Sequence, residues 1–249
     1  MSSGKDNKKR LRLTERDERL MRHLAEFRMS TLPVIEAVCF EGKSTVAAKS
    51  GLRRLMRAKP AVIRSRPLYG RHVYYQLTYA GSRRLGVSHR AAQSIGAMAV
   101  ARQYALQTFH FLEHENVRRR LTGEQVHKAT EVRGPRWQAN LFYLVRGDDK
   151  RLGYIVVDFG STPARFADRI LKRMTSLLEY DRIRRFVKAK AFELSVLTLT
   201  PGKRDSIGQR LKLDANGSMR VRMQQDVFTI HVRLRVIPGL LELIPNPQQ

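Results

Sequence analysis

Residues 44–81 have the sequence STVAAKSGLRRLMRAKPAVIRSRPLYGRHVYYQLTYAG, and this stretch decides the fold of the N-terminal part of the chain. Ser44 or Thr45 is a suitable helix cap, because its side-chain oxygen can accept a hydrogen bond from the first turn. We expect this helix to continue to about Ala58, since Pro60 cannot continue it. The stretch therefore begins with a single capped helix.

The helix predicted at 45–58 has an apolar side and a basic side. We assign its apolar side to Val46, Leu52, Leu55 and Met56. Much of the remaining surface is predicted to carry Lys49, Arg53, Arg54 and Arg57. A helix fits the major groove of duplex DNA, where its exposed side chains can meet base edges. A solvated basic face is the simpler alternative.

Two short strands are expected after this helix, at 62–64 and 72–77. The segment 65–71 between them is rich in turn-forming residues and forms the tip of a hairpin. The basic side chains of the hairpin are Arg64, Arg66 and Arg71. Such a hairpin can reach an adjacent groove or the phosphates of a duplex.

Two more helices are predicted before this stretch. Thr14 caps the first, the second covers 32–38, and another short helix follows the hairpin after Thr78. The order helix, helix, turn, basic helix and basic hairpin is that of a winged helix-turn-helix. We therefore predict a winged helix-turn-helix DNA-binding domain at 13–88, preceded by a basic flexible tail at 1–12.

The whole chain is strongly basic. It has 249 residues, with 48 lysines and arginines against 22 aspartates and glutamates, and a formal net charge of +26. Residues 1–90 carry +14 and the remaining residues +12, so the excess is not confined to one tail. A charge of this size points first to a nucleic acid as partner, and second to a membrane surface or an acidic protein.

Composition excludes several classes of protein. With 42% hydrophobic residues the chain can bury a sizeable core, but its apolar runs are too short for a membrane-spanning helix. The polar N-terminus lacks the apolar core of a secretory signal. The single cysteine, Cys39, excludes an internal disulfide and a zinc site of several cysteines. We therefore expect a cytoplasmic protein, associated with the nucleoid or a plasmid, without membrane contact.

A helix that links two domains is predicted at 89–116, because this segment is rich in alanine and contains no proline. Its small side chains allow close approach of another helix, so it can form a homodimer interface or pack against its own chain. His110 and His114 have the spacing of two metal ligands, but no third ligand is nearby. We therefore treat them as helix-surface histidines and expect no metal and no cofactor.

Strands and helices alternate in the remaining residues, 117–249. Strands are predicted at 136–145, 152–159, 192–199 and 227–237, with a hairpin turn at 146–150. Helices are predicted at 163–190 and 201–211. Alternation along the last strand places Arg233 and Arg235 on one face. The predicted fold class is α+β, with a C-terminal mixed α/β domain after the winged helix-turn-helix and the helical linker.

Asp158, at the end of a predicted strand, is the candidate residue of a metal-dependent nuclease site. Such a site needs clustered acids, and a partner two residues earlier would share its face of the strand. That position is Val156, and neither Trp137 nor Gln138 on the preceding strand is acidic. Lys172 has no acid pair to work with. We therefore expect no catalytic residue, and expect Asp158 to cap the following helix or to pair with an arginine.

The chain resembles the replication–relaxation family of mobile-element proteins through LTERD at 13–17, LAEFR at 24–28, LRRL at 52–55 and YYQLTYAG at 74–81. This resemblance implies an N-terminal winged helix and a role in plasmid replication or DNA relaxation. A weaker resemblance over 136–180 implies a C-terminal core similar to that of restriction endonucleases.

The acids of that core are mostly missing. Members of the family have Pro-Asp on one strand, Glu-x-Asp on the next, and Lys and Tyr in the following helix. This chain has Pro135-Arg136 and Val156-Val157-Asp158 at the first two places, and it keeps Gly160, Thr162 and Tyr180. The resemblance therefore implies a degenerate, inactive nuclease-like domain at 117–249.

Three functions remain open from the sequence. The leading one is a double-stranded DNA-binding protein of a plasmid, phage or integrative element, acting in replication control, DNA transfer or transcriptional regulation. Its expected DNA contacts are Ser44, Thr45, Lys49, Arg53, Arg54, Arg57, Arg64, Arg66 and Arg71. The alternatives are a divalent-metal-dependent DNA nuclease working through the C-terminal domain, and a nucleic-acid-binding assembly factor. Expected partners are duplex DNA, a second copy of the chain, and proteins of a replication or transfer complex.

Overall fold

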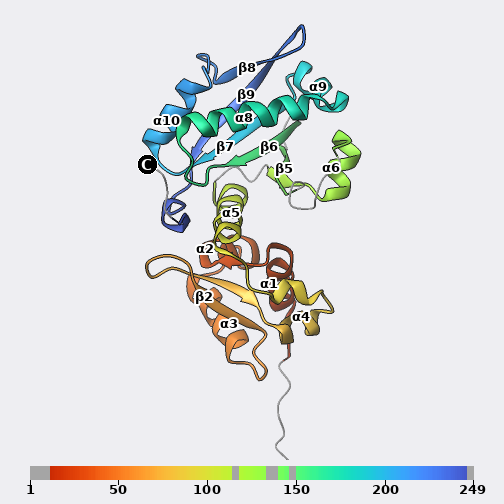
Figure 1. Ribbon diagram of the computed structural model, residues 1–249. Helices are drawn as coiled ribbons and strands as arrows, with labels where there is room; N and C mark the ends of the chain where they lie inside the picture. Colours follow the sequence, from red (N-terminus) through yellow and green to blue (C-terminus); the bar gives the residue numbers. More distant parts are fainter. Residues whose placement is uncertain (1–11, 114–117, 133–139, 146–149, 246–249) are drawn as a thin grey trace, which may run out of the picture. The chain divides into compact units, whose positions relative to one another are not determined.

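The computed structural model describes residues 12–113, 118–132, 140–145 and 150–245. They fold into two compact units, which divide after Gly96 (Figure 1). Each unit combines helices with a sheet, so the chain is α+β as predicted. Three predicted features lie wholly or mostly outside the described residues: the tail at 1–12, the start of the strand at 136–145, and the turn at 146–150.

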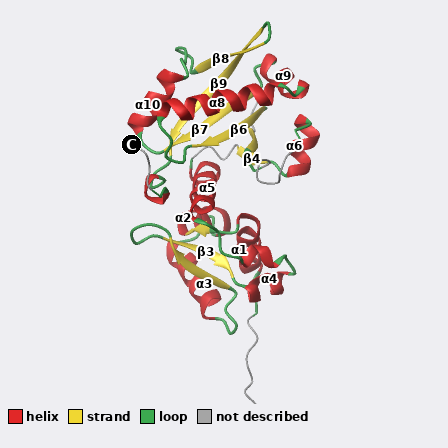
Figure 2. Ribbon diagram, viewed as in Figure 1, coloured by secondary structure: helices red, strands yellow, loops and turns green. Residues whose placement is uncertain are grey.

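The N-terminal unit contains helices and a small antiparallel sheet (Figure 2). Its elements are α1 (Glu15–Phe27), β1 (Ser30–Thr31), α2 (Leu32–Cys39), α3 (Thr45–Arg57), β2 (Ile63–Pro67), β3 (Val73–Leu77), α4 (Tyr79–Leu85) and a 3₁₀-helix (His89–Ala92). β3 is the central strand and pairs with β1 and β2. The helices and both hairpin strands predicted for this unit are confirmed, but β2 continues to Pro67, so the tip is shorter than the predicted 65–71. The structure adds the two-residue strand β1.

Side-chain caps fix where these helices begin. Thr14 accepts a hydrogen bond from the backbone of Asp17, and the Asp17 carboxylate accepts one from the backbone of Thr14. Ser44 caps α3 through the N–H of Ala47, and Thr78 caps α4 in the same way. Each cap pairs a backbone donor that the first turn of a helix leaves unsatisfied. The predicted caps are therefore confirmed.

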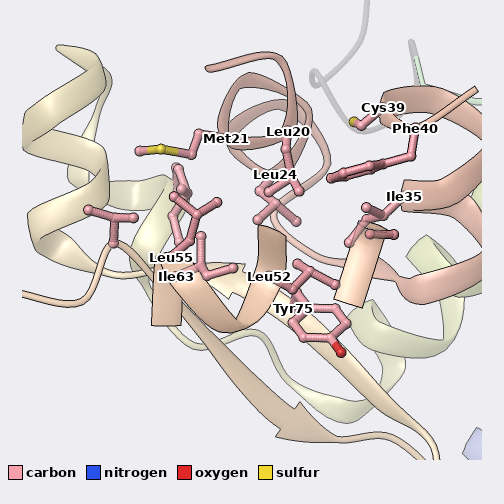
Figure 3. Packing of buried hydrophobic residues seen from close by; sticks show 14 residues of the cluster. Leu20, Met21, Leu24, Ile35, Cys39, Phe40, Leu52, Leu55, Ile63 and Tyr75 are labelled. Atoms are coloured by element: carbon pink, nitrogen blue, oxygen red, sulfur yellow. The ribbon is translucent and has the colours of Figure 1, made fainter. Parts of the chain in front are cut away.

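The apolar sides of α1, α2 and α3 meet in one core (Figure 3). Leu24 of α1, Ile35 of α2 and Leu52 of α3 are almost completely buried, and Tyr75 contributes from β3. Because each helix buries one stripe and leaves the opposite stripe to solvent, the core fixes which side of α3 faces outward.

Val46 is the exception to the predicted apolar side of α3. Its side chain is 74% exposed, whereas Ala48, Leu52 and Leu55 form the buried stripe of the helix. These three positions lie along one side of a helix with 3.6 residues per turn, and position 46 lies opposite to them. The prediction that Val46 belongs to the core is therefore wrong.

The predicted single helix at 89–116 is also wrong. The described part of this segment has three shorter elements: the 3₁₀-helix, α5 (Ala97–Gln107) and a π-helical turn (Thr108–Leu112). The helix does not continue past Ala92, because Gln93 has an extended backbone with φ of −67° and ψ of 145°. Arg64 donates to the carbonyl of Ala92 at 2.6 Å, and Gln76 donates to that of Gln93.

The C-terminal unit is built on a sheet of six strands within the described residues. After α5 and the π-helical turn come β4 (Arg118–Arg120), α6 (Gly123–Thr130), β5 (Phe142–Val145), β6 (Arg151–Val157), α8 (Pro163–Leu178), α9 (Asp181–Lys188), β7 (Phe192–Thr198), α10 (Pro201–Arg210), β8 (Ser218–Met223), β9 (Asp226–Val236) and a 3₁₀-helix (Leu241–Leu243). The strand order is β4-β5-β6-β7-β9-β8, with β6, β7 and β9 parallel. α8 and α10 pack along one face (Figure 1).

Most of the strands predicted in this unit are confirmed, and so is the helix at 201–211. The helix predicted at 163–190 is wrong as a single element, because Tyr180 has an extended backbone and Asp181 begins a separate helix, α9. α9 buries its own apolar stripe, Ile183 and Val187. α5 packs against its own unit, where the Tyr104 hydroxyl donates to the carbonyl of Pro238 at 2.7 Å.

Candidate nucleic-acid interface

The outer side of α3 is polar and basic over its whole length. Its exposed residues are Thr45, Val46, Lys49, Ser50, Arg53, Arg54 and Arg57. Val46, Lys49, Arg53 and Arg57 recur at intervals of three and four residues, so they form one stripe along the helix. A single helix face therefore offers three cationic groups, a hydroxyl cap at Ser44 and an apolar side chain.

Arg54 differs from its neighbour Arg53. Its guanidinium binds both carboxylate oxygens of Asp17, which is only 4% exposed. Burial alone would raise the pKa of Asp17, but the hydrogen bonds from Arg54 and Thr14 outweigh it and hold that pKa below its usual value. Arg54 thus joins α3 to the start of α1, and its main contacts are within the protein.

Arg64 also has an internal role. Besides the Ala92 carbonyl, its guanidinium donates to the side-chain oxygen of Gln76 at 3.1 Å. Arg66 and Arg71, by contrast, are exposed on the hairpin. Seven of the nine predicted contact residues are therefore exposed, and none of the seven forms an ion pair with another described residue. The other two, Arg54 and Arg64, bind groups within the protein.

The tip of the β2–β3 hairpin has a defined conformation. Leu68 donates its backbone N–H to the carbonyl of His72 at 2.9 Å, and His72 donates to that of Tyr69 at 2.8 Å. Gly70 has φ of 50°, the left-handed region that favours glycine. The rings of Tyr69 and His72 lie 4.7 Å apart. The hairpin therefore presents Arg71 from a structured turn.

Val46 and Ser50 were missed as candidate contact residues. Both lie on the exposed stripe of α3, and an apolar side chain beside cations can contact the methyl group of thymine. The signal was present in the sequence. Once Ala48, Leu52 and Leu55 are taken as the buried stripe, position 46 falls on the opposite side.

Asp158 is not placed as a metal ligand. It is fully buried, and its carboxylate accepts the backbone N–H of Gly160 at 3.0 Å. The other oxygen lies 2.8 Å from Nζ of Lys203, so the partner is a lysine of α10 and not the expected arginine. The helix that follows is capped by Thr162. Among the described residues, no three histidine, cysteine, aspartate or glutamate side chains group together as a metal site.

A second buried acid, Glu193, was not noticed in the sequence. It lies on the central strand β7, where the Tyr143 hydroxyl donates to it at 2.6 Å and Nε of Arg233 lies 3.2 Å away. The Tyr143 hydroxyl also lies 2.7 Å from Oγ of Ser195. A Cβ on Gly153 would come within 2.0 Å of the Tyr143 ring, so this network requires glycine at that position. Glu193 thus joins β7 to β5 through a buried hydrogen bond and to β9 through an ion pair.

One face of the β8–β9 pair is also basic. Arg233 and Arg235 lie on the same side of β9, as predicted, because side chains two residues apart share a face. Arg220 and Arg222 of β8 lie opposite Thr229 and Val227 in the register, so they belong to that face too. Arg220 and Arg222 are exposed and no described acid pairs with them, whereas Arg233 lies beside Glu193 and Arg235 beside Glu113. This strand pair therefore extends the positive surface of the C-terminal unit.

Two reactive side chains singled out from the sequence are buried. His110 is not a surface histidine, since burial and the nearby Arg120 and Arg118 lower its pKa to about 3. Its possible metal partner His114 lies outside the described residues. Cys39 is a packed thiol, whose pKa burial raises to about 11. Neither side chain carries a charge near neutral pH.

Comparison of the chain with protein-family models, with curated proteins and with solved structures gives no match. None of the described helices is long and apolar enough to cross a membrane. The geometry and the charge of the two units are therefore the observations from which a function can be inferred.

Proposed function

We propose that residues 13–88 form a winged helix-turn-helix that binds double-stranded DNA. The order α1, β1, α2, α3, β2, β3 and the three-stranded antiparallel sheet support this assignment. The single observation that carries the proposal is the exposed face of α3. On this face Lys49, Arg53 and Arg57 share one stripe with Val46. Such a mixture offers both phosphate contacts and base-edge contacts in a major groove.

The β2–β3 hairpin is the proposed wing. Arg66 and Arg71 are exposed on it, and its tip is held by backbone hydrogen bonds. A preformed cationic loop binds a polyanion at less entropic cost than a flexible one. In this arrangement α3 reads base edges in the major groove, while the hairpin contacts phosphates or the adjacent groove.

We further propose that the chain is a relative of the replication–relaxation family and acts on the DNA of a plasmid, phage or integrative element. Replication control, DNA transfer and transcriptional regulation are the processes that such binding serves. The C-terminal unit is proposed to be a degenerate nuclease-like domain that holds DNA without cutting it. The engagement of Asp158 by Lys203 and the arginines of the β8–β9 face support this role.

The direct test is fluorescence anisotropy with a labelled duplex, competed by unlabelled duplex, single-stranded DNA and structured RNA. We expect duplex DNA to compete best. We expect Arg53→Ala together with Arg57→Ala to weaken duplex binding, and the matched pair Arg22→Ala with Arg83→Ala to leave it nearly unchanged, because those exposed arginines lie on α1 and α4. Preferential competition by RNA would instead favour a nucleic-acid-binding assembly factor.

Selection of bound duplexes from a random pool tests the expected homodimer. A consensus with a two-fold repeat is expected, since half-site symmetry mirrors the symmetry of a dimeric protein. A consensus with a single, unrepeated half-site would show that one chain binds alone.

A further inference from the structure

A cavity of about 300 Å³ opens in the C-terminal unit, at the carboxyl end of strand β6. Three arginines line it: Arg102 of α5, and Arg169 and Arg173 of α8. The rest of its wall is mainly apolar and consists of Leu141, Tyr154, Ile155, Val156, Val157 and Phe159. The volume is at the lower end of the range for small-molecule sites, roughly 300–1,000 Å³.

The described lining of this cavity contains three guanidinium groups and no carboxylate. Arg169 and Arg173 are one helical turn apart, a spacing at which like charges repel each other. Asp168, the acid of α8, lies elsewhere, since it lines a separate hollow together with Lys172 and with Glu179, which follows the helix. The charged residues that α8 contributes to the cavity are therefore the arginines Arg169 and Arg173, whereas Asp168 lies toward the other hollow.

Each of the three guanidinium groups is positioned by an aromatic ring. Arg102 lies over Phe159 at 5.4 Å, Arg169 over Phe166 at 4.9 Å, and Arg173 over Tyr154 at 5.4 Å from the ring centroid. Nε of Arg173 also donates to the Tyr154 hydroxyl at 2.7 Å. These cation–π contacts and the hydrogen bond to Tyr154 restrict the positions of the guanidinium groups before a ligand binds.

We propose that this cavity binds the phosphomonoester of a single nucleotide, either a free nucleoside monophosphate or the phosphorylated end of a DNA strand. Three positioned guanidinium groups suit a compact dianion, because each can form charge-assisted hydrogen bonds with phosphate oxygens. The apolar wall of Leu141, Val156 and Phe159 suits the sugar or the base. The proposal does not depend on the duplex contact of α3, which involves the other unit.

Equilibrium binding of dAMP and of the phosphorylated dinucleotide pTpT to the full-length chain tests the proposal. Deoxyadenosine and TpT, which lack the terminal phosphate, serve as controls. We expect the phosphorylated member of at least one pair to bind roughly tenfold more tightly than its control. Preference for dAMP alone identifies a free nucleotide as the ligand, and preference for pTpT alone identifies a strand end. Equal affinity within both pairs would overturn the proposal.

Variants locate the binding in this cavity. Arg169→Gln, alone and combined with Arg102→Gln, is expected to reduce the affinity for the phosphorylated ligand at least tenfold. Lys172→Gln removes the same charge from the same helix but from a different hollow, so it should leave the affinity unchanged. Arg169 is exposed, and a circular-dichroism melt verifies that its variant remains folded. Unchanged affinity of a folded Arg169→Gln, Arg102→Gln variant would refute the site, whatever the outcome of the duplex experiments.

Discussion

Substitution of Arg53 is expected to weaken DNA binding, whereas substitution of its neighbour Arg54 is expected to lower the stability of the fold. Arg53→Ala removes an exposed cation of α3, so it should change stability by no more than about 0.5 kcal/mol. Arg53→Ala should instead weaken duplex binding roughly tenfold. Arg54→Ala removes the partner of Asp17, a carboxylate that is 4% exposed, so its effect should fall on folding.

The magnitude for Arg54→Ala follows from the exposure of the two partners. Removing one member of a fully buried pair typically costs about 3–5 kcal/mol. The Arg54 side chain is 42% exposed, so water can partly replace it, and we expect about 2 kcal/mol. For a unit of this size that corresponds to a decrease in Tm of roughly 10 °C.

The pH dependence of stability tests the contribution of the Asp17–Arg54 ion pair independently. The pKa of Asp17 is lowered in the folded protein from an ordinary value of 3.8, so the contribution of the ion pair is fully present above that value. It is lost as the pH falls through the folded pKa. The stability difference between wild type and Arg54→Ala should therefore be constant near neutral pH and shrink in acid.

Thermal and urea unfolding, followed by circular dichroism from pH 7 to pH 3, measure the stability of both variants. Anisotropy with a labelled duplex measures their binding. If Arg54→Ala melted like wild type, or if Arg53→Ala lost stability while binding DNA normally, the roles assigned to these two arginines would be wrong. Asp17→Asn combined with Arg54→Ala provides the control, since a neutral partner no longer needs the guanidinium.

Three further predictions concern single positions. Val46→Glu should leave the Tm unchanged, because this side chain is 74% exposed, but it should weaken duplex binding measured by anisotropy through repulsion from phosphates. Gly153→Ala should destabilise the C-terminal unit by about 3 kcal/mol or more in urea unfolding, because its Cβ would overlap the Tyr143 ring. Supercoiled plasmid incubated with magnesium or manganese should remain intact with wild type and with Asp158→Ala alike. Cleavage by wild type alone would establish the nuclease alternative.

The N-terminal elements were predictable because their boundaries depend on local chemistry. Thr14, Ser44 and Thr78 cap helices through their own hydroxyl groups, and Pro60 follows the end of α3. Such features act within a few residues of the chain, so the sequence displays them directly. β8 was also predictable in principle, since SMRVRM at 218–223 alternates between polar and apolar residues.

Other features depend on contacts between distant residues and could not be predicted in this way. The alanine-rich segment after residue 89 is interrupted at Gln93, where Arg64 and Gln76 of the hairpin strands bind the carbonyls of Ala92 and Gln93. The roles of Arg53 and Arg54 differ only because Asp17 lies beside one of them in space. Lys203 pairs with Asp158 across a separation that no local pattern reveals. The candidate site was therefore predictable as a basic helix, but not residue by residue.

If the exposed face of α3 contacts duplex DNA as we propose, its cations must contribute to the salt dependence of binding. We would therefore measure duplex affinity against salt concentration for wild type and for a variant with Lys49→Ala, Arg53→Ala and Arg57→Ala. Each phosphate contact contributes about 0.9 to the slope of log affinity against log salt. We expect the variant to bind more weakly and its slope to be smaller by up to about 2.7. An unchanged affinity and an unchanged slope would show that this face of α3 does not contact DNA.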